Sequence, residues 1–554
     1  MKNSSSFSYK QLTGNGSIMV IIPHEDDEIN LAGAAIYGAR QEGIRVICVF
    51  VTNGDWEYPG SVRMKEAISS LEQLGVPAKD IIFLGYPDGG VHGERSVFLH
   101  GREEKLQVGK HDETYGMKDM EDFSFQENGR HHPYLWESLL ADMEKVILKF
   151  RPSLIMAVDF DFHADHRMCS IAFETVMGNI LKTLHGQYHP MVLKGFCYTT
   201  GFESYDDFFE PHFYSSRVRK EILWDPMYET DNPSFAWRKR IRLPVPPECR
   251  TVLSQNVLFK ALSCHVSQKA FGRAGRIING DEVFWRRCTD NLIYRGTVTA
   301  SSGRPEYLCD FKMMNTDEIG MTHPAMNHYL WIPELHDQGK WCLCNFKQPQ
   351  HVGAIALYGN VDEDSRILKG RLSFSTGYSC EFGPVEKHGH ETFVIVPCQD
   401  EVTWVKLEIL DADGNQAGIS EWEILENTDE SLPFIQIMAD GNFAYDWVVY
   451  PGEKPRISAY YPAGREAFNW FIDGKAATLE EINKKVADLR ESITVRVEPA
   501  DCPTIWNEAK FIPADSLYRF KIGLAQKWNH FCIWKEKQKE KWSHHQLRKL
   551  RARK

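Results

Sequence analysis

Residues 18–28, Ile-Met-Val-Ile-Ile-Pro-His-Glu-Asp-Asp-Glu, decide how the first half of the chain folds. The apolar, mostly β-branched run from Ile18 to Ile22 predicts a buried strand, and Pro23 ends it because proline has no N–H to give to a sheet. The small-residue stretch 29–40 predicts a closely packed helix. A strand that leads directly into a helix places their junction at the carboxyl edge of a parallel sheet, where open α/β folds keep their ligand sites.

This junction holds one imidazole, His24, and four carboxylates, Glu25 to Glu28. Carboxylates crowded together repel one another unless a cation neutralises them. Imidazole nitrogen combined with carboxylate oxygen suits Zn²⁺ or a similar divalent ion. An acidic first turn also complements the helix dipole without any metal. The stretch alone therefore leaves both interpretations open.

A second polar cluster follows another apolar segment. Residues 151–158, Arg-Pro-Ser-Leu-Ile-Met-Ala-Val, predict a strand, and Asp159-Phe-Asp-Phe-His-Ala-Asp-His comes directly after it. His163 and His166 thus lie just past a strand end, as His24 does. Two strand ends with complementary His and Asp clusters can supply three ligands and leave one position open, which is the arrangement of catalytic zinc.

Together the two motifs resemble the pattern of the LmbE-like, GlcNAc-phosphatidylinositol de-N-acetylase (PIG-L) family of metal-dependent N-deacetylases. That pattern is His-Pro-Asp-Asp-Glu followed later by His-x-Asp-His, and the resemblance covers about the first half of the chain. One departure is Glu25, which stands where the family usually has proline. The glutamate adds a charge beside the metal but leaves the ligand residues intact, so we expect metal binding to be retained.

The resemblance implies a role for each residue of the two motifs. The metal, Zn²⁺ or another divalent ion, is held by His24, Asp27 and His166, which leaves a position for water. Asp26 is the general base that takes the proton of this water. His163 stabilises the oxyanion or protonates the leaving amine.

Three further aspartates surround the second motif. By the same resemblance, Asp165 and Asp159 orient the imidazole ligands, as carboxylates around metal sites commonly do. Asp161 is ambiguous between that role and a turn.

Two residues outside the motifs are candidates for sugar binding by resemblance. Arg63 begins an Arg-x-x-Glu helix start, and Asp88 lies in a Gly-Tyr-Pro-Asp turn. An arginine fork and a carboxylate can orient a hydroxyl-rich sugar. The alternatives are a helix-face ion pair between Arg63 and Glu66 and a purely structural turn role for Asp88.

Further strands and helices alternate through the first half of the chain. Residues 43–52 and 81–84 predict strands, while residues 63–74 and 134–150 predict helices. This alternation is typical of a Rossmann-like, doubly wound parallel sheet. No Gly-x-Gly-x-x-Gly follows the first strand, so a dinucleotide is not indicated. We assign residues 1–288 to this metal-dependent N-deacetylase domain.

Short, turn-separated strands follow and predict β-sandwich domains. The order of segments within 289–427 resembles the discoidin (coagulation-factor type C) module. Such modules often bind glycans through aromatic residues, and Trp331 is a candidate, with packing in the core as the alternative. Residues 428–510 predict a small, immunoglobulin-like β-domain.

Residues 511–554 predict a basic, amphipathic tail. From 519 to 554 there are twelve Lys or Arg and two Glu, a net charge of +10, whereas the whole chain has −12. Leu524, Trp528, Phe531 and Cys532 follow helical spacing, which among many lysines is typical of a helix lying on anionic lipid. A solvated tail, or one docked on the acidic body, is the alternative. The acidic body argues against a nucleic-acid partner.

The expected location is the cytoplasm, with possible peripheral contact at a membrane. The N-terminal residues lack an apolar signal region, no run of about 18 apolar residues occurs, and the thirteen cysteines are scattered without a Cys-x-x-Cys pair. Reduced, mostly buried thiols are the expected state.

The function that these features predict is hydrolysis of an N-acetyl group on an amino sugar of a glycan or glycolipid, releasing acetate. One alternative is a glycan-binding protein whose catalytic site is degenerate because of Glu25. The other is a deacetylase of a small glycoconjugate such as a thiol cofactor precursor. The appended β-domains favour the larger substrate, because a small soluble one does not require them.

Overall fold

The structure is a computed structural model, and it describes most of the chain. The described residues are 7–159, 163–197, 202–203, 214–218, 239–269, 279–312, 330–360, 365–387, 390–426, 432, 434–462 and 467–551. Asp161, a candidate from the second motif, lies outside them.

A seven-stranded sheet in the order β3-β2-β1-β4-β5-β9-β8 forms the centre of the first domain. The first five strands run parallel, and β9 and β8 add antiparallel at one edge, so the predicted parallel sheet is confirmed and extended into a mixed one. The strands are β1 (Ile18–Ile22), β2 (Val46–Thr52), β3 (Ile81–Tyr86), β4 (Leu154–Val158), β5 (Met191–Gly195), β8 (Ile241–Pro244) and β9 (Asp281–Arg287).

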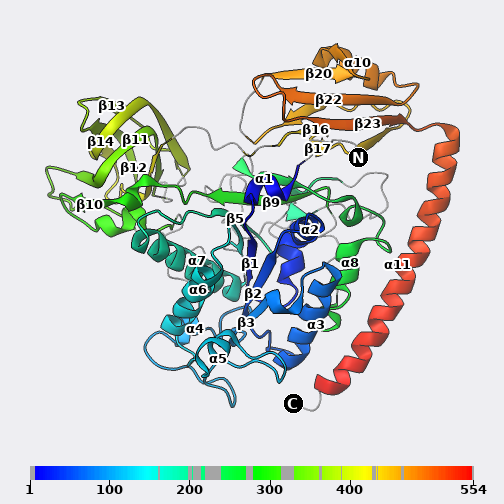
Figure 1. The fold of residues 1–554 in the computed structure, drawn as a ribbon, viewed down its shortest axis with the longest axis horizontal. Helices are drawn as coiled ribbons and strands as arrows, with labels where there is room; N and C mark the ends of the chain where they lie inside the picture. The colour runs from blue at the N-terminus through cyan, green and yellow to red at the C-terminus, as the bar shows by residue number, and fades with distance from the viewer. Residues whose placement is uncertain are drawn as a thin grey trace.

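Helices cover both faces of this sheet, which explains why every residue of β1, β2 and β4 is buried. In Figure 1, α2, α3 and α8 lie to one side of the sheet, and α6 and α7 lie to the other. The helices of this domain are α1 (Tyr9–Thr13), α2 (Asp27–Gln41), α3 (Gly60–Gln73), α4 (Val97–His100), α5 (Phe123–Asn128), α6 (Trp136–Phe150), α7 (Ala164–Thr183) and α8 (Val257–Leu262). Minor elements are the strand pair β6 (Phe202–Glu203) and β7 (Arg217–Val218), and the 3-10 turns η1 (Ala78–Asp80), η6 (Pro247–Cys249) and η7 (Val266–Gln268).

A six-stranded antiparallel sheet follows, in agreement with the predicted β-sandwich region. Its interior is continuous with the core of the first domain. Trp331 is fully buried there, and its indole Nε1 donates to the carbonyl of Ser302 at 2.9 Å, so this tryptophan is a core residue. The elements are η9 (Leu292–Arg295), β10 (Gly296–Ala300), η10 (Pro305–Cys309), β11 (Trp341–Gly359), β12 (Arg366–Phe374), β13 (Ser379–Phe382), β14 (Glu391–Asp413) and β15 (Ile419–Leu425).

A third region has a hydrophobic core of its own. It contains a three-stranded sheet of β17, β16 and β19 and a five-stranded sheet in the order β18-β23-β22-β20-β21. The elements are β16 (Gln436–Ala439), β17 (Asn442–Phe443), β18 (Asp446–Val449), β19 (Ile457–Tyr460), β20 (Phe468–Ile472), β21 (Lys475–Ala477), α10 (Leu479–Ala487), β22 (Ile493–Pro499) and β23 (Asn507–Pro513).

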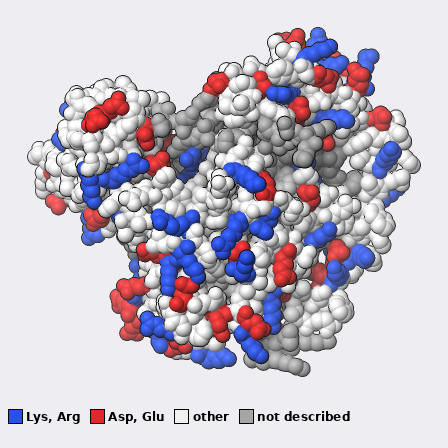
Figure 2. Space-filling model, viewed as in Figure 1, with Lys and Arg blue, Asp and Glu red and all other residues white. Residues whose placement is uncertain are grey.

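The chain ends in a single long helix, α11 (Ser516–Arg551). It leaves the third region after β23 and runs back beside α8 of the first domain, as the red helix of Figure 1 shows. Among the described helices, none is long and apolar enough to span a membrane. The face of the molecule in Figure 2 carries basic and acidic side chains interspersed. The cysteines are free thiols, most of them buried.

Candidate metal centre and active site

The first motif forms a tight turn between β1 and α2. Asp26 has φ 126° and ψ −18°, a conformation that residues other than glycine rarely adopt. His24 and Asp27, on either side of this turn, are almost fully buried. A strained backbone persists only where its surroundings hold it, so the residues around Asp26 must fix this turn.

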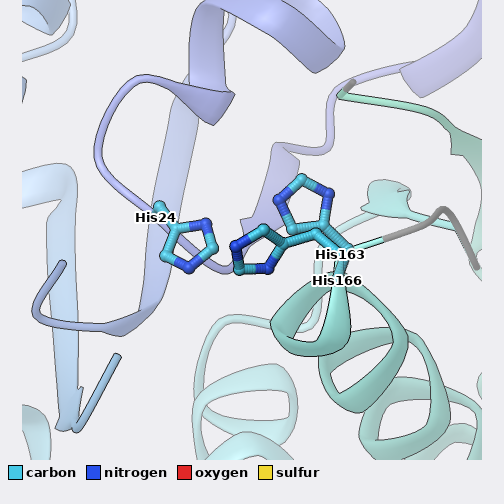
Figure 3. Close-up of side chains that lie close together, drawn as sticks. All are labelled: His24, His163 and His166. Carbon is cyan, nitrogen blue, oxygen red and sulfur yellow. The ribbon is translucent and has the colours of Figure 1, made fainter. Parts of the chain in front are cut away.

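Three imidazole rings converge at the carboxyl edge of the sheet. Figure 3 shows His24, from the loop after β1, facing His163 and His166 at the start of α7. The ring centroid of His24 lies 4.8 Å from that of His163 and 5.3 Å from that of His166, and the last two are 5.0 Å apart. The two motifs, 141 residues apart between His24 and Asp165, therefore form one site.

Asp27 joins two of these rings. Its Oδ2 lies 3.1 Å from His24 Nδ1 and 3.3 Å from His166 Nε2, so the predicted ligands His24, Asp27 and His166 are brought together. Burial opposes the charge on Asp27, yet His166 and His24 hold the pKa of this carboxyl well below its usual range. Asp27 thus lies between two imidazoles, and both favour the charged form of its carboxyl group.

Asp165 and Asp88 lie on the other side of His24. Asp165 Oδ2 is 3.0 Å from His24 Nε2 and accepts the backbone N–H of Gly89 at 2.8 Å, which fits the predicted role of orienting an imidazole. Asp88 Oδ1 is 3.9 Å from His24 Nε2 and accepts the N–H of Gly90, so Asp88 is both a turn residue and a site neighbour. Burial raises the pKa of Asp165 to about 6.

The donor groups fit a divalent metal ion. The three histidines form one set whose candidate ligand atoms all lie within 4.8 Å of one another. Two more sets share members with it: His24 with Asp88 and Asp165, and Asp27 with His166 and Cys197. Nitrogen, carboxylate oxygen and one thiol in a buried position are the ligands that zinc and its neighbours prefer.

The candidate base Asp26 is held by Arg63. Arg63 Nη2 donates to Asp26 Oδ1 at 2.9 Å and also to the carbonyl of Glu25. The alternative pair of Arg63 with Glu66 is not what the structure shows, because Glu66 accepts from the backbone and hydroxyl of Ser267. Arg63 is therefore in contact with the predicted base. Burial raises the pKa of Glu25 to about 8 in spite of the nearby guanidinium.

Glu28 stabilises the turn through its side-chain carboxylate, a role that the sequence analysis did not predict. Its Oε2 accepts the backbone N–H of Asp26 at 2.9 Å. Its Oε1 accepts from Ser70 Oγ at 2.8 Å and lies 2.7 Å from His265 Nε2. His265 follows α8 and is completely buried. A buried histidine requires a polar partner. The acidic run at 25–28 was the sequence feature that could have indicated such a partner for His265.

For two residues beside the site, the structure shows contacts that the sequence analysis did not predict. Asp159, predicted to orient an imidazole, has its Oδ1 2.9 Å from Lys194 Nζ and so joins the ion pairs of that lysine with Glu174. Cys197 was not predicted, although it follows the end of β5, next to β4. Its Sγ lies 3.9 Å from the carbonyl oxygen of Asp27. The rule that strand ends share one edge would have identified it.

Comparison with protein families gives two matches. Residues 19–177 match the PIG-L family model, described as GlcNAc-PI de-N-acetylase. Residues 291–425 match a domain of unknown function, DUF7402. No curated protein matches the chain.

Parts of the chain are also similar to solved structures. An N,N'-diacetylchitobiose deacetylase from Pyrococcus horikoshii has 20% identity and TM-score 0.22, over 32% of this chain and 60% of its own. A deacetylase of the teicoplanin biosynthesis pathway has 17% identity and TM-score 0.27, over 49% and 97%. The family 32 carbohydrate-binding module of C. perfringens NanJ has 15% identity and TM-score 0.19, over 24% and 94%. From the family match, residues 19–177 are a domain of the PIG-L, LmbE-like deacetylase family, as the two motifs predicted.

Proposed function

We propose that the protein hydrolyses the N-acetyl group of an amino sugar in a glycan or glycolipid and releases acetate with the help of a divalent metal, zinc or another. The family of residues 19–177 supports N-deacetylation of amino sugars in general. The observation that carries the proposal for this chain is the convergence of His24, His163 and His166 around Asp27 at one sheet edge.

His24, Asp27 and His166 are the residues that would hold the metal. A divalent ion bound there would make its water a better nucleophile and polarise the amide carbonyl. Asp165 keeps the ring of His24 in place through its contact with Nε2. The Asp27 carboxylate, 3.1 Å from His24 Nδ1 and 3.3 Å from His166 Nε2, would add negative charge beside the two imidazole ligands.

The chain's own residues carry the protons. The Asp26 carboxylate takes a proton from the attacking water, whose oxygen bonds to the carbonyl carbon, while Arg63 holds Oδ1 of this carboxylate. The backbone N–H of Asp165 donates to His163 Nδ1, at 3.2 Å, so a neutral His163 carries its proton on Nε2. From Nε2 it donates a hydrogen bond to the oxyanion, and Asp26 returns the proton that it took from water to the departing nitrogen as the C–N bond breaks, which leaves acetic acid, ionised to acetate in solution, and a free amine.

The substrate is placed by residues and regions outside the metal cluster. We assign Asp88 and Arg63 to the sugar, the first because it lies 3.9 Å from His24 Nε2 and the second because it adjoins Asp26. The β-sandwich would hold a longer glycan. More specifically, the proposed substrate is a lipid-linked sugar at an anionic membrane surface. The protein would then be peripheral to the membrane, on its cytoplasmic side.

Acetate release and metal content together test this proposal. Full-length protein is incubated with a panel of N-acetylglucosamine-containing glycans and glycolipids, and its bound metal is quantified. We expect wild type to contain metal and release acetate, and His166→Ala to lose both. His336→Ala, which removes an exposed histidine of the β-sandwich region, is the matched control and should behave as wild type.

Two results would contradict the proposal. Metal without acetate release across the whole panel would leave a glycan-binding protein with a degenerate site, or a deacetylase of a small glycoconjugate. Neither metal nor acetate release from a folded wild type would reject the catalytic function itself.

A further inference from the structure

Helix α11 exposes a large apolar surface. Seven of its side chains are between 50% and 66% exposed, although each is aromatic or leucine: Leu517, Phe520, Leu524, Trp528, Phe531, Trp534 and Trp542. They are separated by three, four or eight residues, so they lie on one side of an α-helix. We call this set the outer face of α11. Single exposed apolar residues are ordinary, but a contiguous row of this kind marks an interaction site.

Three neighbouring aromatic rings in the middle of the outer face contact one another. The ring centroids of Trp528 and Phe531 lie 5.5 Å apart, and those of Phe531 and Trp534 lie 6.1 Å apart. The outer face therefore has an aromatic centre of three rings, and its other members extend from Leu517 to Trp542 along a helix of 36 residues, about 54 Å in length at 1.5 Å per residue.

The opposite side of α11 already has a partner, the first domain. Asn529 is 3% exposed, and Ile533 packs against the main core. Glu536 and Glu540 line a shared pocket with Phe259 of α8. Because this inner side is in contact with the protein body, the outer face points away from it. The direction is the reverse of a usual surface helix, whose apolar side faces the core.

The acidic and basic residues of α11 also differ in their exposure. Its two acidic residues, Glu536 and Glu540, are on the packed side and partly buried. The exposed charged side chains among its described residues are all basic: Arg519, Lys521, Lys527, Lys535, Lys537, Lys539, Lys541 and Arg548. A partner of the outer face must therefore offer an apolar layer and negative charge beside it.

We propose that the outer face of α11 docks on the surface of an anionic lipid bilayer, with the aromatic rings at the level of the headgroups and the lysines against lipid phosphates and carboxylates. An interfacial helix has these properties: a polar side rich in lysine, and tryptophan, phenylalanine and leucine on the other side. A second copy of the chain fits less well, since two outer faces brought together would confront basic residues with basic residues. This inference does not depend on the proposed deacetylase activity.

Vesicle flotation of the full-length protein tests the proposal. We expect binding to phosphatidylcholine vesicles that contain phosphatidylserine, and much weaker binding to phosphatidylcholine alone. The triple substitution Trp528→Ser, Phe531→Ser and Trp534→Ser should weaken binding at least about tenfold, because three interfacial side chains are lost. Leu335→Ser with Ile395→Ser, which removes two exposed apolar residues of the β-sandwich region, is the matched control.

Acetate release from a soluble glycan is measured on the same samples, so that loss of membrane binding is distinguished from loss of the enzyme. Circular dichroism verifies that α11 is retained in the triple variant. Failure of wild type to bind anionic vesicles, or equal binding by the folded triple variant, would overturn the proposal. So would a concentration-dependent dimer in sedimentation velocity that the triple variant abolishes, since a second copy would then occupy the outer face.

Discussion

The histidine site buries polar side chains, whereas the outer face of α11 exposes apolar ones. Both are the reverse of the usual distribution of residues in a folded protein. His24, His163 and His166 are no more than 7% exposed, whereas Trp528 and Trp542 are each 66% exposed. Buried polar groups and exposed apolar rings both cost free energy unless a partner compensates. The difference between the two regions lies in the partner that each requires, a cation for the first and an apolar, negatively charged surface for the second.

The comparison also shows how each region is held in place. The histidine site rests on the strand ends of a sheet that is buried on both faces, and its strained turn is fixed by Arg63 and Glu28. The outer face lies on one helix, which contacts the first domain through its inner side. Substitutions in the site should therefore change the chemistry, while those on the outer face should change binding alone.

The largest effect is expected for Asp26→Asn. Loss of a positioned general base typically lowers the rate by about 100-fold to 10,000-fold. The amide can still accept from Arg63, and the metal ligands are unchanged, so metal content should equal that of wild type. Acetate release per bound metal is the measurement, with Asp400→Asn in the β-sandwich region as control. Activity within twofold of wild type would remove Asp26 from the role of base.

A smaller effect, on binding and not on chemistry, is expected for Lys527→Gln, Lys535→Gln and Lys541→Gln together. Each lysine near an anionic surface contributes about 1 kcal/mol, so vesicle binding should weaken about 100-fold. The three side chains are exposed, and the thermal unfolding temperature should therefore stay unchanged. Binding that is insensitive to these substitutions and to added salt would show that charge has no part in docking.

An effect of about tenfold on turnover is expected for His265→Ala. His265 contacts Glu28, which in turn accepts the backbone N–H of Asp26, so its loss would relax the turn that carries the base. Groups that orient a metal site in this indirect way typically contribute about 10-fold to 100-fold. We expect kcat to fall with little change in KM and with metal retained.

The variant His265→Gln separates positioning from packing. Its amide N–H can donate to Glu28, so it should recover part of the turnover that His265→Ala loses. Equal activity of the two variants, both folded and both with metal, would mean that His265 only fills space.

Sequence patterns predicted the strands and motifs that form the site better than the buried contacts that hold its turn. The strand at 18–22 was found because an apolar run ends at Pro23, and the two motifs then met because parallel strands end at one edge. The contact of Glu28 with His265 spans 237 positions, and no local pattern specifies it. Helical spacing likewise predicted that α11 has an apolar side, but only tertiary packing shows that this side faces outward.

The smallest predicted effect concerns Asp310, a buried acid outside the histidine site. It shows which property distinguishes that site from other buried polar groups. Burial raises the pKa of Asp310 to about 7, an effect that Lys312 and Lys182 partly oppose and Glu174 reinforces. The folded state then binds more protons than the unfolded chain between about pH 4 and pH 7, so Asp310 should make stability fall as pH rises through this window.

Asp310→Asn removes the titrating group, and the free energy of unfolding should depend less on pH between 5 and about 8 than in wild type. Urea unfolding at the two pH values measures this difference, and acetate release should be unaffected at either one. An unchanged pH dependence would show that Asp310 is ionised in the folded protein. The groups around Asp310 are mixed lysines and carboxylates without a convergent set of imidazoles, and Phe311 next to it packs in the shared core of the first domain and the β-sandwich. Burial of a polar group therefore marks a metal site only where several ligand atoms converge, as they do around His24 and nowhere near Asp310 among the described residues.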